Sequence, residues 1–322
     1  MVTFKRILVT GSSGVLGSAF KALRDEFPWY EMFFATDKDC DLTDLSASLD
    51  YVKGIGPDAI VHLAAVSGGV ILSMEHPATV LRDNILMSIH VLEISRILEI
   101  KKLVMTLSSG MFPADAPIPI KEEYIHQGPA HPSNYAYAYA KRLIEPAIRG
   151  YRAEYGVSVI GVIPNGIFGP NDKFDAKSAT FITALIKRFY ENKNNDSPIV
   201  VWGDGSPLRE ITYSADMARA FMWCLSHYDS EQVLNVGTSE EHSIKDIAFM
   251  IAEELGIDTR RIVFDTSKPS GIFRKSTDNS KFVQLSGFRY APLRVGIKNT
   301  IEWLKRNNHL LKAGSPKKGE AN

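Results

Sequence analysis

Apolar runs alternate with amphipathic stretches through the first half of the chain. Short runs of aliphatic and aromatic residues predict buried strands, and the stretches between them carry apolar positions at helical spacing. The predicted strands are 7–9, 32–35, 59–63, 103–105 and 157–163, and the predicted helices are 15–23, a long helix ending with 91–98, and 136–155. Such alternation is typical of βαβ units, so the sequence predicts an α/β fold with a doubly wound parallel sheet.

After about Pro170 the pattern changes. Short strand, helix and turn signals mix, with turn residues clustered at 192–198 and 203–207. A helix is predicted at 244–255 and a strand at 261–264. No linker composition separates the two halves, so we expect a smaller mixed α/β domain that is interleaved with the first. The expected division is 1–170 for the first domain, 171–313 for the second, and 314–322 for a polar, disordered tail.

Composition changes this picture little. Hydrophobic residues make up 45% and charged residues 23%, the balance of an ordinary globular protein. The 37 basic and 37 acidic residues cancel, so charge gives no reason to expect nucleic acid or an anionic membrane as a partner. No apolar run approaches the roughly 20 residues of a transmembrane helix, and no secretory signal is recognisable. Cys40 and Cys224 are far apart, so we expect reduced thiols, a cytoplasmic location and no metal site.

The first chemical signal is a glycine-rich turn, Gly11-Ser12-Ser13-Gly14-Val15-Leu16-Gly17. Glycine allows a tight turn and a close approach of the backbone to a pyrophosphate, and the N-terminus of the following helix offers N–H groups to that anion. An ordinary tight turn would use the same glycines. The strand before the turn and the helix after it favour a dinucleotide-binding turn, with contacts from Gly11, Ser13, Gly14, Val15, Leu16 and Gly17.

An acidic residue, Asp37, follows the second predicted strand. A carboxylate there can accept hydrogen bonds from the adenosine ribose hydroxyls and repels a 2′-phosphate, which favours NAD as the cofactor. The competing interpretation is a solvated turn residue within Thr36-Asp37-Lys38-Asp39. Lys38 could still pair with a phosphate, which keeps NADP open.

The strongest signal is the pair Tyr137 and Lys141, spaced i and i+4 on a predicted helix. A neighbouring ammonium favours the phenolate, so we expect it to lower the tyrosine pKa from about 10 toward neutrality. The pair could then move a proton while a hydride passes to or from nicotinamide. Ser108 and Ser109 follow a strand at the edge where α/β sheets bind ligands, and a serine hydroxyl can position the same substrate oxygen. A surface Tyr–Lys pair is the competing interpretation, which the order of these motifs along the chain disfavours.

These motifs, together with His62-Leu63-Ala64-Ala65, resemble those of the extended short-chain dehydrogenases. Among them the GDP-L-fucose synthases, which are epimerase-reductases, are the most similar. The segments that carry this resemblance cover nearly the whole chain: 133–142, 163–172, 201–210, 235–238 and 264–269. The resemblance implies a Rossmann domain, a GDP-sugar domain and a homodimer. It also implies cofactor contacts at Leu63, Ala64, Ala65, Pro164 and Ile167, in addition to Tyr137 and Lys141.

Position by position, Ser108, Tyr137 and Lys141 match the family's catalytic trio. The substrate positions implied by the resemblance are Ser109, Gly110, Asn165, Thr180, Arg188, Trp202, Arg209 and Lys268. The last four match positions that hold the GDP end, where Arg and Lys would neutralise the diphosphate and Trp would pack on a sugar or base. A helix-face Arg, a buried core Trp and loop surface charges are the competing interpretations.

The departures from the family are informative. The family uses a Cys and a His to epimerise C3 and C5 before reducing C4, and these positions are Gly110 and Thr180 here. Neither can act as a base near neutral pH, so we expect the epimerase activity to be missing. Asn165-Gly166 stand where the family has Thr-Asn, and Asp37 stands where relatives that use NADPH have a neutral or basic residue.

The leading hypothesis is therefore an NAD-dependent C4 oxidoreductase of a GDP-manno-configured hexose or heptose. Oxidation is slightly favoured, because cellular NAD is mostly oxidised, and because the resemblance extends to relatives that oxidise GDP-manno-heptose in capsule sugar pathways. In this hypothesis Lys141 also holds the ribose, and Ser108 positions the C4 oxygen. The alternatives are an NADPH-dependent GDP-4-keto-6-deoxy sugar reductase, a full GDP-L-fucose synthase, or a non-catalytic dinucleotide sensor, which would typically lack the Tyr or the Lys.

Overall fold

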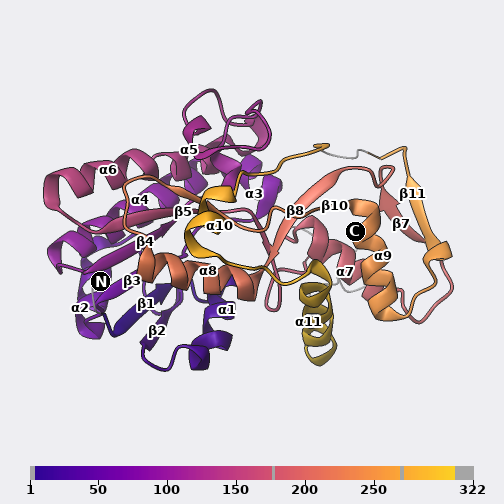
Figure 1. The fold of residues 1–322 in the computed structure, drawn as a ribbon, viewed down its shortest axis with the longest axis horizontal. Coiled ribbons are helices and arrows are strands. Elements are labelled where there is room, and N and C mark those ends of the chain that lie inside the picture. The colour runs from indigo at the N-terminus through magenta and orange to yellow at the C-terminus, as the bar shows by residue number, and fades with distance from the viewer. Residues whose placement is uncertain (1–3, 176–177, 269–271, 309–322) are drawn as a thin grey trace, which may run out of the picture.

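A six-stranded parallel sheet forms the centre of the first lobe (Figure 1). The computed structural model describes residues 4–175, 178–268 and 272–308, so the expected tail at 314–322 lies outside the described residues. In spatial order the strands are β2 (Glu31–Ala35), β1 (Arg6–Thr10), β3 (Ala59–His62), β4 (Lys102–Thr106), β5 (Val159–Pro164) and β9 (Leu234–Val236). The strand order reverses between β1 and β3, which makes their carboxyl ends the topological switch point. The predicted Rossmann-type α/β fold is confirmed.

Helices cover both faces of this sheet, because its strands are apolar on both sides. On one face α1 (Val15–Leu23) and α8 (Ser214–His227) pack on the strands, together with Phe282 of α10 (Ser280–Ser286). On the other face lie α2 (Leu45–Ile55), α4 (Pro77–Ile97) and α6 (Ile144–Tyr155). A short helix, α3 (Gly69–Glu75), precedes α4. Within the described residues, no helix is long and apolar enough to cross a membrane.

The helix predicted over 136–155 is in fact two helices, α5 (Tyr135–Arg142) and α6. Pro146 has no N–H to donate to the carbonyl of Arg142, and such a residue is tolerated only in the first turn of a helix. A new helix therefore begins at Ile144, and α5 is left as a separate two-turn element. This short helix carries both Tyr137 and Lys141.

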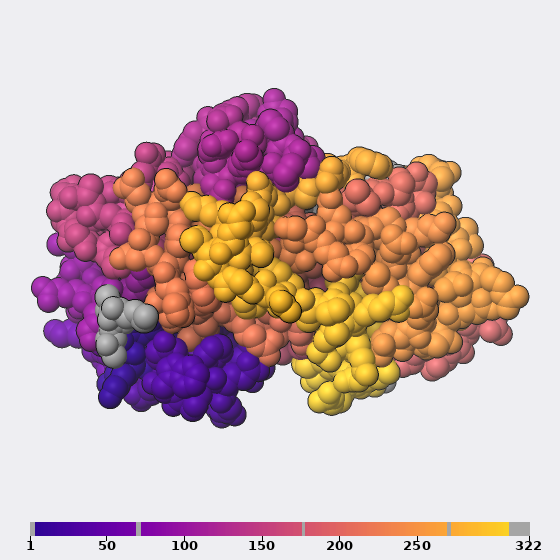
Figure 2. Space-filling model, viewed as in Figure 1, coloured from indigo at the N-terminus to yellow at the C-terminus, as the bar shows by residue number. Residues whose placement is uncertain are grey.

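The second lobe has its own apolar core. It contains the helices α7 (Phe181–Glu191), α9 (Ile244–Leu255) and α11 (Leu293–Arg306), a three-stranded sheet of β10 (Glu241–Ser243), β8 (Leu208–Tyr213) and β6 (Gly166–Phe168), and a two-stranded sheet of β11 (Ile262–Asp265) and β7 (Ile199–Trp202). The N-terminus of α9 carries a capping box of Ser243 and Asp246, which explains why the helix begins where the sequence predicts. In the space-filling view a notch separates the first lobe from α11 along the lower edge (Figure 2).

The two lobes are connected by several crossings of the chain. After β8 the chain returns to the first lobe as α8 and β9, and β9 pairs in parallel with β5. It then forms α9 and β11 in the second lobe and returns again as α10. We propose on this basis that the two domains are interleaved.

A buried polar network lies where these crossings meet, centred on Glu210 of β8. The Glu210 carboxylate is 6% exposed and accepts hydrogen bonds from the Thr277 N–H (2.8 Å) and from the side-chain amide of Asn279. Burial raises the pKa of Glu210 from 4.5 to about 7, although its hydrogen-bond donors oppose that shift. The network therefore joins β8 to the segment that leads into α10.

Candidate active site

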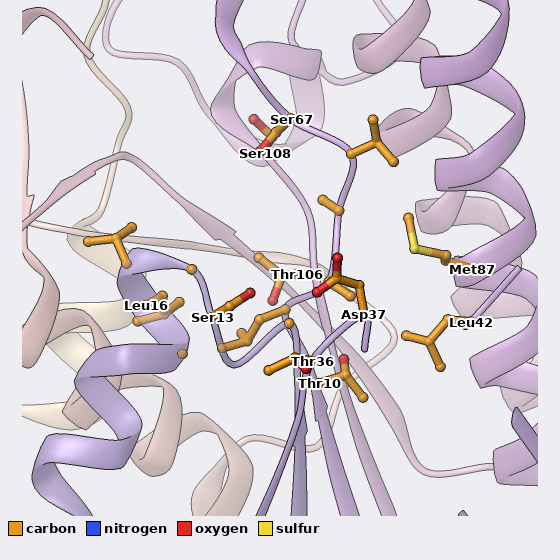
Figure 3. Close-up of a pocket in the computed structure, with 18 of the residues that line it drawn as sticks. Thr10, Ser13, Leu16, Thr36, Asp37, Leu42, Ser67, Met87, Thr106 and Ser108 are labelled. Atoms are coloured by element: carbon orange, nitrogen blue, oxygen red, sulfur yellow. The ribbon is translucent and has the colours of Figure 1, made fainter. Parts of the chain in front are cut away.

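A cavity of about 1020 Å³ lies at the carboxyl ends of β1, β3, β4 and β5. Most of the residues singled out in the sequence line it: the glycine turn except Ser12, Asp37, residues 63–65, Ser108, Ser109, Tyr137, Lys141, Pro164, Asn165, Ile167 and Thr180. Figure 3 shows Ser67 and Ser108 in one part of the cavity and Asp37, Leu42 and Met87 in another. The glycine turn and the Ser108, Tyr137 and Lys141 side chains therefore line one common space. Lys38, Gly110, Arg188, Trp202, Arg209 and Lys268 are not among its lining residues.

The glycine turn fits a diphosphate. Gly11 has a φ of +65°, and a Cβ there would lie 2.5 Å from the backbone N of Ala64, so the turn packs directly on the end of β3. A Cβ at Gly14 would meet only the Gly11 carbonyl, at 3.5 Å, so the backbone is open to the cavity at that point. Gly14 is the N-cap residue of α1, a helix that has no side-chain cap and no acidic residue in its first turn. Such a helix N-terminus favours a bound anion, and these observations match a dinucleotide cofactor.

The two acids of the turn after β2 have different roles in the structure. Asp39 holds the turn, because its carboxylate accepts hydrogen bonds from the Thr36 N–H (2.8 Å) and hydroxyl (2.7 Å). Asp37 is exposed, lines the cavity and has no hydrogen-bond partner among the described residues. Asp37 therefore fits both interpretations, because it is an exposed turn residue and its carboxylate is free to accept a hydrogen bond from a ligand in the cavity. Lys38 is exposed and lies outside the cavity lining.

Two apolar side chains beside Asp37, those of Leu42 and Met87, were not singled out in the sequence (Figure 3). Leu42 lies in the loop before α2, and Met87 lies on α4. Their sequence separation hides the pairing. They give this part of the cavity an apolar lining that a base could contact.

The proposed catalytic trio is brought together by β4 and α5. Ser108 lies just beyond β4 and begins a short 3-10 helix, η2 (Ser109–Met111), where its hydroxyl oxygen accepts a hydrogen bond from the Gly110 N–H (3.1 Å). On α5, Tyr137 forms a hydrogen bond with Ser108. Lys141 is 2% exposed, and its ammonium donates to the Thr106 carbonyl (2.9 Å) at the end of β4, 5.9 Å from the centre of the Tyr137 ring. Serine, tyrosine and lysine thus meet at the carboxyl edge of the sheet.

The protonation of this trio differs from the expectation. Burial raises the pKa of Tyr137 above its ordinary value, and the hydrogen bond from Ser108 offsets only part of that effect. Lys141 does not lower the tyrosine pKa, because its ammonium is directed at Thr106 instead, and burial lowers its own pKa to about 8. The prediction of a tyrosine pKa near neutrality is therefore wrong for the free protein. Tyr137 carries its proton at neutral pH.

A buried histidine lies next to this trio. The sequence motif that contains it gave it no role of its own. His62 ends β3 and is fully buried, with its Nδ1 2.9 Å from the Thr10 hydroxyl. Its Nε2 has no hydrogen-bond partner in the part of the chain that the structure describes. Burial, and then the charge of Lys141, lower the pKa of His62 to about 3, so the imidazole is neutral. The signal that could have found it is the pair of polar residues that end the neighbouring strands β1 and β3.

The two positions where the epimerase residues of the family would stand lie near the trio. A Cβ at Gly110 would lie 3.3 Å from the Ser108 hydroxyl oxygen and 3.3 Å from the side-chain nitrogen of Asn134. Thr180 lines the cavity at the start of α7, and its hydroxyl is 3.0 Å from that of Thr183. Neither position offers a base.

Asp172 carries a carboxyl group that the sequence motifs did not single out. Asp172 lines the cavity, and burial raises its pKa from 3.8 to about 6. Its Oδ1 accepts from the Lys173 N–H (2.8 Å), whereas its Oδ2 is buried with no hydrogen-bond partner among the described residues. Asp172 therefore has the chemistry of an acid or a base near neutral pH.

Asn165 does not have the free amide that a substrate contact would need. It is buried, its side-chain oxygen accepts from the Thr212 hydroxyl (2.7 Å), and its nitrogen donates to the Thr238 carbonyl (2.9 Å). Glu210 receives a further hydrogen bond from this amide. The amide is thus occupied by protein groups, and Asn165 belongs to the network between the lobes.

The four residues expected at the GDP end lie in the second lobe, outside the cavity lining. Arg188 donates to the Val200 carbonyl (2.5 Å), and Arg209 donates to the Ile272 carbonyl (2.9 Å) with its guanidinium 5.6 Å from the Phe181 ring. Trp202 is 57% exposed on β7, so its interpretation as a buried core residue is wrong. Lys268 is exposed. Trp202 and Lys268 are thus exposed, whereas Arg188 and Arg209 are partly buried, and none of the four lines the cavity.

Comparison with known proteins agrees with this geometry. The family model "NAD dependent epimerase/dehydratase family" matches residues 7–237. The chain belongs to this family. A GDP-L-fucose synthase from Dictyostelium discoideum is 36% identical over 311 residues, which cover 95% of this chain and 97% of that protein. The predicted resemblance to the extended dehydrogenases and the GDP-L-fucose synthases is confirmed.

Solved structures are similar over nearly the whole chain. A GDP-L-fucose synthetase from Naegleria fowleri bound to NADP has a TM-score of 0.89 and 34% identity, with coverage of 96% of this chain and 95% of that one. A GDP-mannoheptose C4 reductase from Campylobacter jejuni with NADP bound has a TM-score of 0.84 and 24% identity, covering 95% and 99%. The second likeness shows the common fold.

Proposed function

We propose that this protein is a nucleotide-sugar oxidoreductase that uses NAD(P)H to reduce the C4 ketone of a GDP-linked sugar. The observation that carries the proposal is the meeting of Ser108, Tyr137 and Lys141 at the wall of the cavity. The GDP-L-fucose synthases among the relatives favour reduction, the direction in which the Tyr137 hydroxyl donates its proton. This departs from the slight preference for oxidation inferred from the sequence.

The residues of the trio would act in a defined order. The nicotinamide, when bound, supplies the hydride that C4 accepts. The Ser108 hydroxyl holds the C4 oxygen, and Tyr137 donates its proton to that oxygen as the ketone becomes a secondary alcohol. Lys141 ties α5, and with it Tyr137, to the end of β4 through its hydrogen bond to the Thr106 carbonyl (2.9 Å). Proton transfer of this kind contributes roughly 10²- to 10⁴-fold in rate.

The GDP end of the substrate would bind to the second lobe. Arg188, Arg209 and Lys268 supply positive charge for a diphosphate, and the exposed Trp202 ring supplies a surface for a base or sugar. The GDP-L-fucose synthases among the relatives support a GDP-sugar. The sugar would then extend toward Ser108 and Tyr137.

We further propose that NADH is preferred over NADPH. The free carboxylate of Asp37 lies in the cavity and suits the ribose hydroxyls of NAD, and Lys38 lies outside the cavity lining. A 2′-phosphate beside Asp37 would meet a like charge. The similar structure with NADP bound makes NADPH the competing cofactor.

A second candidate is the full epimerase-reductase reaction, and Asp172 is the observation that favours it. Gly110 and Thr180 cannot act as bases, but a carboxyl group with a pKa of about 6 lines the same cavity. We nevertheless propose reduction without epimerisation, because a base must be placed to within about 0.5 Å of its working position.

We also propose a homodimer. Three large apolar side chains lie exposed at i, i+4 and i+8 along α5 and the residue that joins it to α6: Tyr135, Tyr139 and Leu143. Ile89 and Ile97 of the neighbouring α4 are exposed too. A second copy of the chain would remove such a ridge from water.

The test is to offer three GDP-sugars separately to the purified protein: the 4-keto-6-deoxymannose, mannose and manno-heptose derivatives. Each is combined with NAD(H) and with NADP(H), and the absorbance of the reduced nicotinamide is followed. We expect oxidation of NADH only with the 4-keto sugar, and no turnover by Tyr137→Phe. Turnover that starts only from the alcohol sugars with an oxidised cofactor would refute the proposed direction, and no turnover with any pair would refute the proposed function.

A further inference from the structure

Arg142 is a buried cation that the proposed mechanism does not use. Arg142 is the residue after Lys141 on α5, and it is 6% exposed. Its guanidinium has no carboxylate partner within the described ranges. Its guanidinium donates to the Met111 carbonyl through Nε (3.0 Å) and Nη2 (2.6 Å), and to the Gly128 carbonyl through Nη1 (2.8 Å). The Tyr139 ring lies 4.9 Å away and covers it. A buried charge is costly unless it is fully hydrogen-bonded, so filling space does not explain an arginine here.

The two carbonyls belong to one long connection, which runs from the end of β4 to the start of α5. Met111 is near its beginning and Gly128 near its end. Met111 is also bound to the catalytic turn itself, because its N–H donates to the Ser108 carbonyl (3.0 Å). Arg142 therefore holds the serine turn at a position one hydrogen bond removed from Ser108.

We propose that Arg142 is a positioning residue that fixes the Ser108 turn relative to α5, the helix that carries Tyr137 and Lys141. Two neighbouring residues of α5 would then connect this helix to two different segments. Lys141 binds the Thr106 carbonyl and so ties the helix to the end of β4, and Arg142 ties the same helix to the turn that follows β4. The planar fork of a guanidinium can hold two carbonyls in one fixed geometry, which an ammonium cannot. Misplacing a reacting group by about 1 Å can cost 10²-fold in rate.

The inference rests on the proposed reduction, and a double-mutant cycle tests it. Arg142→Met should lower kcat on the order of 10- to 10²-fold while the dissociation constant of the reduced cofactor stays within about twofold, since the cofactor turn is untouched. In a Ser108→Ala background the same substitution should lower kcat by less than about twofold, because the group that it positions is already gone. Equal losses in both backgrounds, or no loss in either, would overturn the proposal.

Two further variants separate positioning from stability. Arg152 on α6 is a matched control, because it also donates to a main-chain carbonyl (Val159, 3.0 Å) and pairs with Asp229 far from the cavity lining. Arg152→Met should lower the melting temperature and leave kcat unchanged. Arg142→Lys can reach one carbonyl and should recover part of kcat, and it serves as the test variant if Arg142→Met does not fold.

A substrate-free measurement keeps the inference independent of the proposed function. In fluorotyrosine-labelled protein, ¹⁹F NMR follows the titration of each of the 12 tyrosines, and Tyr137→Phe assigns the signal of Tyr137. Loss of the Ser108 hydrogen bond should move this titration to higher pH in Ser108→Ala, and Arg142→Met or Arg142→Lys should move it in the same direction. An unchanged Tyr137 titration in the Arg142 variants would overturn the inference even if no GDP-sugar proves to be a substrate. Failure of every sugar with the wild-type protein would instead count against the proposed function alone.

Discussion

Replacing the buried carboxyl of Glu210 should change how the stability of this protein depends on pH. Glu210 is 6% exposed, and burial raises its pKa from 4.5 to about 7. Between these two values the folded state keeps the Glu210 proton while the unfolded chain has lost it. Stability from this group is therefore fully present below pH 4.5 and is lost as the pH rises to about 7. A salt-bridged carboxylate has the opposite effect, because its contribution to stability is lost as the pH falls.

The size of the effect follows from the shift. Each pKa unit corresponds to about 1.4 kcal/mol, so a shift from 4.5 to about 7 is worth about 3 kcal/mol. Glu210→Gln cannot titrate and should lack this loss. Urea unfolding of both proteins at pH 5 and pH 7.5 gives the free energies of unfolding. The stability of the wild type relative to Glu210→Gln should fall by about 2 kcal/mol between these pH values, because part of the total loss lies outside this range. Glu240→Gln, at an exposed position of the same lobe, is the control and should unfold in parallel with the wild type.

Parallel pH profiles for the wild type and Glu210→Gln would refute this reasoning. They would mean that the donors around the carboxylate, which include the Thr277 N–H and the Asn279 amide, keep Glu210 ionised despite its burial. Burial and hydrogen bonding act on the same group with opposite signs. The experiment measures which of them is larger.

Three other predictions concern the cavity. Tyr137→Phe should lower kcat by on the order of 10²-fold or more without loss of cofactor binding. Wild-type kcat for reduction should fall at alkaline pH as Tyr137 loses its proton. Near-normal turnover by Tyr137→Phe would remove Tyr137 from the mechanism. Asp37→Ser should narrow the preference of NADH over NADPH, measured as a ratio of dissociation constants, and a wild type that prefers NADPH would contradict the assigned role of Asp37. With Gly110 and Thr180 at the epimerase positions, the 4-keto sugar should take up no deuterium at C3 or C5 from heavy water beyond the rate without enzyme. Enzyme-dependent uptake that disappears in Asp172→Asn would instead establish the epimerase-reductase reaction.

The parts of the site that could be predicted are those encoded in short segments. The glycine turn lies within seven residues, and Tyr137 and Lys141 lie one helical turn apart, so local spacing is enough to identify them. The pKa of Tyr137 could not be predicted, because it depends on where the Lys141 ammonium points and on how deeply the hydroxyl is buried. Helical spacing predicts that the two side chains are close to each other, but it predicts neither the direction of the ammonium nor the burial of the hydroxyl.

Other features depend on contacts between distant segments. Asn165 matched a substrate position in the sequence, yet its partners Thr212 and Thr238 lie 47 and 73 residues away and occupy its amide. Arg142 binds main-chain carbonyls, which every residue has, so no pattern of side chains could reveal its partners. The break between α5 and α6 could have been predicted from the sequence, because Pro146 has no N–H to donate to the carbonyl of Arg142, four residues earlier.

The return of the chain to the first lobe has a consequence for synthesis on the ribosome. The apolar face of β1 and β3 is covered partly by α1, and the rest of it is covered only by α8 and Phe282. The edge of β5 stays unpaired until β9 has been synthesised. Translation from residue 171 to residue 286 takes on the order of ten seconds. During that time the nascent first lobe exposes an apolar face and an open strand edge, both of which favour aggregation. A nascent chain stalled near residue 170 should therefore bind chaperones that recognise apolar segments, and release from them should require the chain to extend beyond α10.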